Sequence, residues 1–211
     1  MGALVRKGAE AALYGATWHG VPVMKKVRLP KPYRLPQLDR DLRRSRTIRE
    51  AQLLNDAKRA GVSTPLLYHV DVAHATLIME YVDGPRVKEL LPHLPRGERR
   101  QLCHRIGELI GRLHGAGIIH GDLTTSNMIR RPNDRIVFID FGLAEYSTEV
   151  EKRGVDIHLM KRALESTHYR HAKACYAAIL AGYAHEVSPA QAKDVVTRVQ
   201  EISRRGRYTG S

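Results

Sequence analysis

The stretch IIHGDLTTSN, at residues 118–127, constrains what this chain can be more than any other. It places Asp122 in a polar loop after a segment with helical periodicity, and Asn127 follows five residues later. A second acidic residue, Asp140, closes the apolar segment RIVFID and opens the tripeptide DFG. Each stretch alone is also typical of an ordinary surface turn. Their order along one chain favours a loop that performs chemistry.

Two charged residues earlier in the chain complete this set. Lys25 ends a predicted strand, and Glu50 lies within a predicted helix. A strand lysine held by a helix glutamate is the arrangement that places an ammonium group on nucleotide phosphates. Asp122 would then orient a hydroxyl group or accept its proton, while Asn127 and Asp140 would hold magnesium, whose preferred ligands are oxygens. The five residues in this order predict phosphoryl transfer from ATP.

The expected elements form an α+β chain in two parts. In the first part, β-favouring residues around Gly15 and Gly20 predict a hairpin, residues 38–60 predict a helix, and residues 66–84 predict two antiparallel strands. The second part is mostly helical, with a boundary near residues 83–85. There the pattern predicts a hairpin over 128–140 and helices over 98–114, 156–166, 169–181 and 189–204.

The charge balance predicts a polyanionic partner. Lys and Arg number 35 against 22 Asp and Glu, which gives a net charge of +13. The basic residues cluster at 25–34, 40–49 and 204–207. One Trp and two Phe argue against an aromatic platform for stacked bases. Phosphate contact is therefore the expected mode of binding.

Several other classes are not expected. No apolar run approaches the ~20 residues of a membrane span, and the N-terminus has no apolar core of a signal peptide, so we expect a cytoplasmic protein. Cys103 and Cys175 are expected to be small buried hydrophobic residues. His168, His171 and Cys175 are spaced loosely like metal ligands, but no fourth ligand is evident and we expect no metal there.

The chain also resembles the protein kinase superfamily, and specifically its smallest atypical members. These are the kinase-like subunits, or PRPK family, of the KEOPS (EKC) complex that makes threonylcarbamoyladenosine on tRNA. The resemblance runs from residue 7 to 168 through KGAEA, VMKKVRLPKPYRLPQLD, RTIREAQLL, LIMEYVDG, IIHGDLTTSNMI, FIDFGLA and GVDIHLMKRALESTH. It implies a reduced bilobal kinase fold, with a β-rich N-lobe (1–83) holding one key helix, a truncated helical C-lobe (84–203) and a basic tail (204–211).

The resemblance also implies a Ser/Thr kinase or ATPase with ATP and Mg as cofactors. Its partners would be the threonylcarbamoyl transferase subunit of the complex, a small regulatory subunit contacting the N-lobe, and tRNA, modified next to its anticodon. The residues implied are catalytic Asp122; ATP-binding Gly8, Ala9, Glu10, Lys25, Glu50, Glu80 and Tyr81; metal-binding Asn127 and Asp140; and tRNA-binding Arg204, Arg205 and Arg207.

The sequence departs from ordinary kinases at three places. The nucleotide loop KGAEAALYG lacks the pattern G-x-G-x-x-G, so a flexible glycine-rich lid is not expected, although Gly8 still lets backbone approach a phosphate. Gly121 replaces the usual Arg, so switching by loop phosphorylation is not expected. No A-P-E motif follows Gly142, and the usual platform for a peptide substrate is largely missing.

Three alternatives remain open at this point. A RIO-like kinase of ribosome maturation is also small, but such proteins generally lack the DFG found here. A small-molecule phosphotransferase shares H-G-D-x-x-x-x-N, but usually carries a long helical insertion for its acceptor. A non-catalytic RNA-binding scaffold would suit the basic charge, but has no need for two magnesium ligands.

Overall fold

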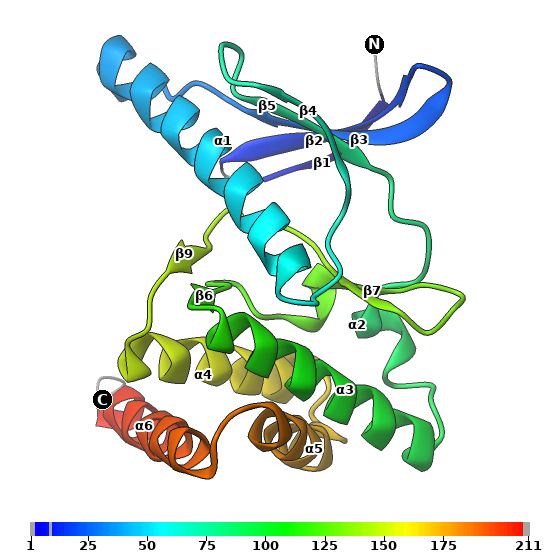
Figure 1. Cartoon of the computed structure of the whole chain (residues 1–211), viewed down its shortest axis with the longest axis vertical. Coiled ribbons are helices and arrows are strands. Elements are labelled where there is room, and N and C mark those ends of the chain that lie inside the picture. Colours follow the sequence, from blue (N-terminus) through cyan, green and yellow to red (C-terminus); the bar gives the residue numbers. More distant parts are fainter. Residues whose placement is uncertain (1–2, 9, 209–211) are drawn as a thin grey trace.

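The computed structural model describes residues 3–8 and 10–208, with side chains as far as residue 205. The first part of the chain is an antiparallel five-stranded sheet in the order β1-β2-β3-β5-β4. The long helix α1 crosses this sheet diagonally (Figure 1). The bounds are β1 Ala3–Lys7, β2 Ala11–Trp18, β3 Val21–Arg28, α1 Pro36–Arg59, β4 Leu67–Asp71 and β5 Thr76–Glu80.

The predicted hairpin, helix and strand pair of this part are all confirmed. A proline opens α1, where its missing N–H costs nothing, and Gly61 follows the helix with a φ of +80°, which favours glycine. The first strand, β1, was not predicted, because five residues at the start of a chain give too short a pattern to read. It extends the sheet by pairing Arg6 with Leu13 and Lys7 with Ala12.

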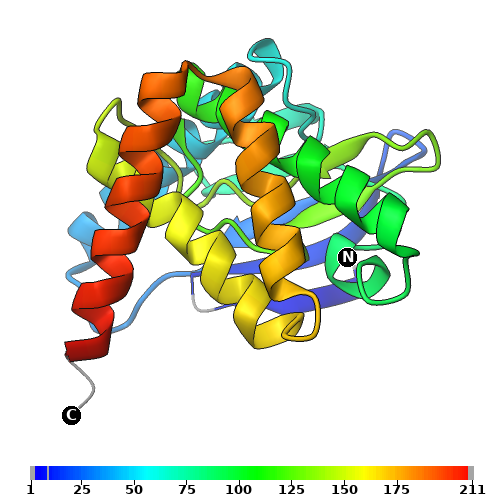
Figure 2. The same ribbon diagram turned by 90° about the horizontal axis from the view of Figure 1, so that it is seen from below.

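The second part of the chain is mostly helical, as predicted, and its helices stack below the sheet (Figures 1 and 2). The hairpin expected over 128–140 is present as β7 and β8. Helix α4 begins at Val150, earlier than the expected residue 156. The bounds are α2 Val87–Leu90, α3 Arg96–Gly115, β6 Ile118–Ile119, the short 3-10 helix η1 Thr125–Asn127, β7 Met128–Arg130, β8 Ile136–Phe138, β9 Glu145–Tyr146, α4 Val150–Thr167, α5 Ala172–Glu186 and α6 Pro189–Tyr208.

Helices α3 and α5 pack with their backbones in direct contact. A Cβ atom on Gly107 of α3 would lie 2.0 Å from the carbonyl oxygen of Ile179, and one on Gly182 of α5 would lie 1.9 Å from that of His104. Only glycine leaves room for this approach. Cys103 and Cys175, on the same two helices, are both buried, as expected, and both are free. The core of the second part forms around this helix pair.

The C-terminal part of α6 corrects one expectation. Residues 204–208 continue this helix, so they are not a separate tail, and residues 209–211 lie outside the described residues. Before this end, α6 buries Val195 and Val199 at helical spacing, and the Ser203 hydroxyl donates to the Val199 carbonyl oxygen at 2.8 Å. Among the helices described, none is long and apolar enough to cross a membrane.

Candidate active site

A buried lysine on β3 joins the two parts of the chain. Lys26 Nζ lies 2.6 Å from Glu50 Oε1 on α1 and 2.6 Å from Asp140 Oδ1, which follows β8. The Lys26 and Glu50 side chains are only 8% and 2% exposed, whereas that of Asp140 is 43% exposed. An ammonium group held in this way between a helix glutamate and a loop aspartate can meet the phosphates of a nucleotide.

The predicted pairing of Lys25 with Glu50 is wrong. Successive residues of a strand point to opposite faces, and on β3 the face toward the cleft carries Met24, Lys26 and Arg28. Lys25 is exposed on the other face. Lys26 therefore takes the position that was predicted for Lys25.

Arg28, one alternation further along β3, was not predicted as part of the site. Its guanidinium donates to the second carboxylate oxygen of Glu50 at 2.6 Å and lies 3.8 Å from Glu10 in the β1–β2 loop. Arg46 of α1 also donates to Glu10, which lowers the pKa of that carboxyl group. Glu10, at the end of the β1–β2 loop, is thus tied to α1 and β3 by ion pairs.

The charges at the centre of the site are stable near neutral pH. Burial alone would lower the pKa of Lys26, but the carboxylates of Glu50 and Asp140 outweigh it and raise that pKa above 10.5. Burial alone would raise the pKa of Asp140, but the Lys26 ammonium outweighs it and lowers that pKa below 3.8. Both groups therefore remain charged between these two limits.

The loop 118–127 is held by the buried Asp156 of α4. One carboxylate oxygen accepts the backbone N–H of His120 at 2.8 Å and lies 3.2 Å from His114 Nε2; the other accepts the N–H of Gly121 at 2.9 Å. Within the loop, Asn127 Nδ2 donates to Asp122 Oδ2 at 2.7 Å. The two predicted residues are therefore brought together. Asp156 was missed, since nothing in an amphipathic helix marks which polar residue turns inward.

The glycine of HGD is required by the backbone. Gly121 has a φ of +77°, and a Cβ there would lie 2.4 Å from the carbonyl oxygen of Leu143. The arginine of ordinary kinases does not fit this conformation. The preceding His120 is fully buried, and its ring centroid lies 4.7 Å from that of Phe141. Burial lowers its pKa, which suits a neutral imidazole that braces the loop.

Two adjoining cavities surround Lys26. One, of about 200 Å³, has a mostly apolar lining that includes Met79, Ile129 and the predicted residues Glu80 and Tyr81. The other, of about 310 Å³, which we call the polar cavity, is lined by the charged residues Glu10, Asp122 and Asp140, together with Gly8 and apolar residues. Ala9 lies outside the described residues. Four residues line both cavities and so mark their junction: Arg6, Leu13, Lys26 and Asp140.

These cavities have the chemistry that ATP and magnesium need. The apolar one suits a flat base, and the polar one offers an ammonium group for phosphates. Asp140 Oδ2 and the amide oxygen of Asn127 have no protein hydrogen bond among the described residues, and such oxygens are the ligands that magnesium prefers. The donor set therefore fits a magnesium–nucleotide complex.

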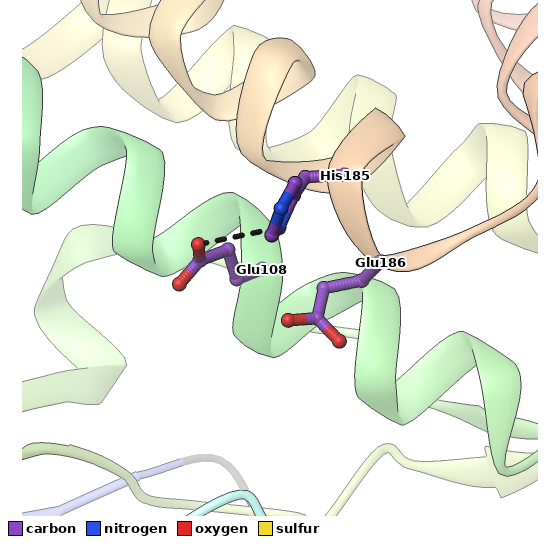
Figure 3. A group of neighbouring side chains, drawn as sticks. All are labelled: Glu108, His185 and Glu186. Carbon is purple, nitrogen blue, oxygen red and sulfur yellow. Dashed lines mark ion pairs between the residues drawn. The ribbon is translucent and has the colours of Figure 1, made fainter.

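Two histidine-containing groups elsewhere do not carry a metal argument. His168 Nε2 lies 2.9 Å from the Thr125 hydroxyl, so His168 helps to hold the loop 118–127 in place. Glu108 of α3 faces His185 and Glu186 at the end of α5, with 3.6 Å between Glu108 Oε1 and His185 Nδ1 (Figure 3). Arg105 and Arg112 already neutralise the two carboxylates, at 3.2 and 2.9 Å. We interpret this second group as a set of ion pairs that stabilises the contact between α3 and α5.

Comparison with known proteins places the chain in a family. A protein kinase domain matches residues 23–174. The KEOPS complex subunit Bud32 of Pyrococcus abyssi (strain GE5 / Orsay) is 45% identical over 211 residues, which cover 97% of this chain and 96% of that protein. The chain belongs to the Bud32 family of protein kinase domains. The EKC/KEOPS complex subunit bud32 of Dictyostelium discoideum is 35% identical over 213 residues, covering 98% of this chain and 83% of that protein.

A second kind of Bud32 relative is longer. A probable bifunctional tRNA threonylcarbamoyladenosine biosynthesis protein of Methanothermobacter thermautotrophicus is 48% identical over 206 residues, covering 98% of this chain but 36% of that protein. Membership of the Bud32 family confirms the resemblance seen in the sequence and decides against a RIO-like kinase or a small-molecule phosphotransferase. A protein kinase domain also implies ATP binding.

Proposed function

We propose that this chain is the kinase-like subunit of a KEOPS complex, in which it uses ATP as a Ser/Thr phosphotransferase, as an ATPase, or as both. In that complex it supports the formation of threonylcarbamoyladenosine next to the anticodon of tRNA. The observation that carries the proposal is the contact of Lys26 with both Glu50 and Asp140 at the junction of the two cavities. The KEOPS part rests on the names of its Bud32 relatives.

The roles of the residues follow from their contacts. Lys26 supplies a fixed positive charge for phosphate, and Glu50 holds it there. Asp122 Oδ2 is bonded to Asn127, so Asp122 Oδ1 is left to orient an attacking hydroxyl group or water. Asp140 and Asn127 would hold magnesium, which when bound neutralises charge on the phosphates. The hydrogen bond from the Asn127 amide to Asp122 fixes the position of the general base relative to the metal ligands.

The segment after DFG favours an acceptor that does not have to dock there as a peptide. Between Gly142 and Val150 the described chain contains only the short strand β9 before α4 begins. Tyr146 of this strand donates to Asp56 of α1 at 2.7 Å, so the segment is tied to the N-lobe helix. Such a segment offers little surface for docking a peptide. Water or a nearby Ser or Thr of the complex is the acceptor that we propose.

Labelled ATP separates this function from that of a non-catalytic RNA-binding scaffold, the second candidate that the net charge of +13 favours. The protein would be incubated with ATP labelled on its γ-phosphate, alone and with its transferase partner and tRNA. We expect label as free phosphate or on Ser/Thr, and its loss when EDTA removes magnesium. Label that stays in ATP under every condition, with or without EDTA, would establish the scaffold and reject the enzyme.

We further propose that tRNA binds through basic residues at the end of α6. Arg204 and Arg205 lie there, and Arg205 is only loosely paired, 3.9 Å from Glu151. The side chain of Arg207 lies outside the described residues. The N-lobe contact with a small regulatory subunit, the contact with the transferase subunit, the lobe boundaries given above and the cytoplasmic location also remain predictions.

Replacing Arg204, Arg205 and Arg207 together with Ala should weaken tRNA binding and make it less dependent on salt. Each lost phosphate contact lowers the slope of log K against log salt by about 0.7–0.9, so three lower it by roughly 2–3. A matched triple substitution of the exposed Arg40, Arg44 and Arg49 on α1 serves as the comparison. If only the α1 triple changes the slope, the RNA surface lies on α1 and the α6 assignment is wrong.

A further inference from the structure

The cations around the polar cavity are largely committed to protein carboxylates. Lys26 contacts Glu50 and Asp140, and Arg28 contacts Glu50 and lies near Glu10. Arg46, behind them, also contacts Glu10. Each of these positive charges is therefore at least partly neutralised before any nucleotide enters. A nucleotide carrying several negative charges gains most from a cation that has no such partner.

Arg6 of β1 is a cation of this kind. It is exposed, and it lines both cavities, at the junction of the apolar and polar halves. Within residues 3–8 and 10–205, no ion pair or side-chain hydrogen bond engages its guanidinium group. Its neighbour on the strand, Leu13 of β2, lines the same two cavities. Because its guanidinium group lies at the junction and has no such partner within the described residues, Arg6 is available to a ligand there.

The nucleotide loop provides a reason for such a residue. Without the pattern G-x-G-x-x-G, this loop has few positions at which backbone N–H groups can approach phosphates closely. The N–H of Gly8 already donates to the Ala11 carbonyl oxygen at 2.9 Å. A guanidinium group offers five donors in a planar fork that fits phosphate oxygens. It can therefore replace part of what a glycine-rich loop supplies.

We propose that Arg6 binds the phosphates of the nucleotide, as a recognition residue that compensates for the missing glycine-rich loop. This rests on the proposed function, since it requires that the chain bind ATP. Arg6 lies where the cavity for the base meets the cavity for the phosphates. It should therefore contribute to every adenine nucleotide that carries phosphate, and contribute nothing to adenosine.

The test compares Arg6→Ala with Lys7→Ala. Lys7 opens the segment KGAEAALYG, but the structure places it in β1, next to Arg6 and outside both cavities, so with the same charge it controls for the general loss of positive charge. Calorimetry would give the affinities for ATP, ADP and adenosine. We expect Arg6→Ala to lose about tenfold in affinity for ATP and ADP, with adenosine unchanged. Lys7→Ala should lose less than about twofold, and Arg6→Lys should recover part of the loss.

The outcomes are distinct. If the wild-type protein binds none of the three ligands, the proposed function fails, and the role of Arg6 fails with it. If the wild type binds ATP and Arg6→Ala binds it equally well, only the role of Arg6 is wrong. Equal losses for Arg6→Ala and Lys7→Ala would show a general effect of charge, and a loss shared by adenosine would show a disturbed cavity. Either result also overturns the proposal.

Discussion

Replacing Lys26 with Ala is expected to lower ATP turnover by about 1,000-fold, whereas replacing Lys25 with Ala should change it by less than about twofold. The two lysines are adjacent on β3 and carry the same charge, so each is a matched control for the other. Only Lys26 contacts Glu50 and Asp140; Lys25 points away from both cavities. The measurement is the rate of phosphate release or of protein labelling at saturating ATP.

The folded state should survive the loss of Lys26. Glu50 would still have Arg28 at 2.6 Å, so no buried carboxylate is left without a partner, and circular dichroism should show an unchanged fold. A double-mutant cycle adds a second test. Lys26→Ala combined with Glu50→Gln should lose little more than Lys26→Ala alone, because the two residues act as a unit. Equal losses for Lys25→Ala and Lys26→Ala would mean that strand geometry does not select the working lysine.

The wrong choice of Lys25 as the partner of Glu50 shows how much of the site can be predicted from the sequence. The order of the polar residues identified the kind of site, and Asp122 and Asn127 do lie together. The pattern VPVMKKVR, however, places apolar residues on both faces of the strand, with Val23 on the face of Lys25 and Met24 on that of Lys26, so period-2 alternation could not tell which lysine faces the helix. The face was decided by the pairing of β3 with β2 and β5, and such pairing is a property of the folded sheet.

The supporting residues were harder to predict than the central ones. Asp156 and Arg28 act through contacts between elements far apart in the sequence, and each sits in a local pattern that suits an ordinary surface. The same holds for glycines. Gly115 and Gly182 both lie within helices, yet only Gly182 meets another backbone. Which glycine is required for packing depends on where two helices cross, and this crossing cannot be predicted from the local sequence.

This contrast leads to the largest expected effect on stability. Gly182→Ala should lower the free energy of unfolding by about 3 kcal/mol, or roughly 6–12 °C in Tm. The added Cβ would lie 1.9 Å from the His104 carbonyl oxygen and 3.1 Å from the Glu108 backbone nitrogen, so α3 and α5 must move apart. Neither backbone can yield as a flexible side chain would. The measurement is thermal unfolding followed by circular dichroism.

Gly115→Ala is the matched control, since its Cβ would meet nothing within 4 Å. In a helix this change is expected to stabilise by up to about 1 kcal/mol, because alanine loses less backbone entropy on folding. No residue of α3 or α5 lines the two cavities around Lys26, so Gly182→Ala should bind ATP normally well below its Tm. A Tm equal to that of Gly115→Ala would show that the two helices are not in backbone contact. Lost ATP binding in a protein that is still folded would show instead that the packing of α3 against α5 sets the geometry of the nucleotide cleft.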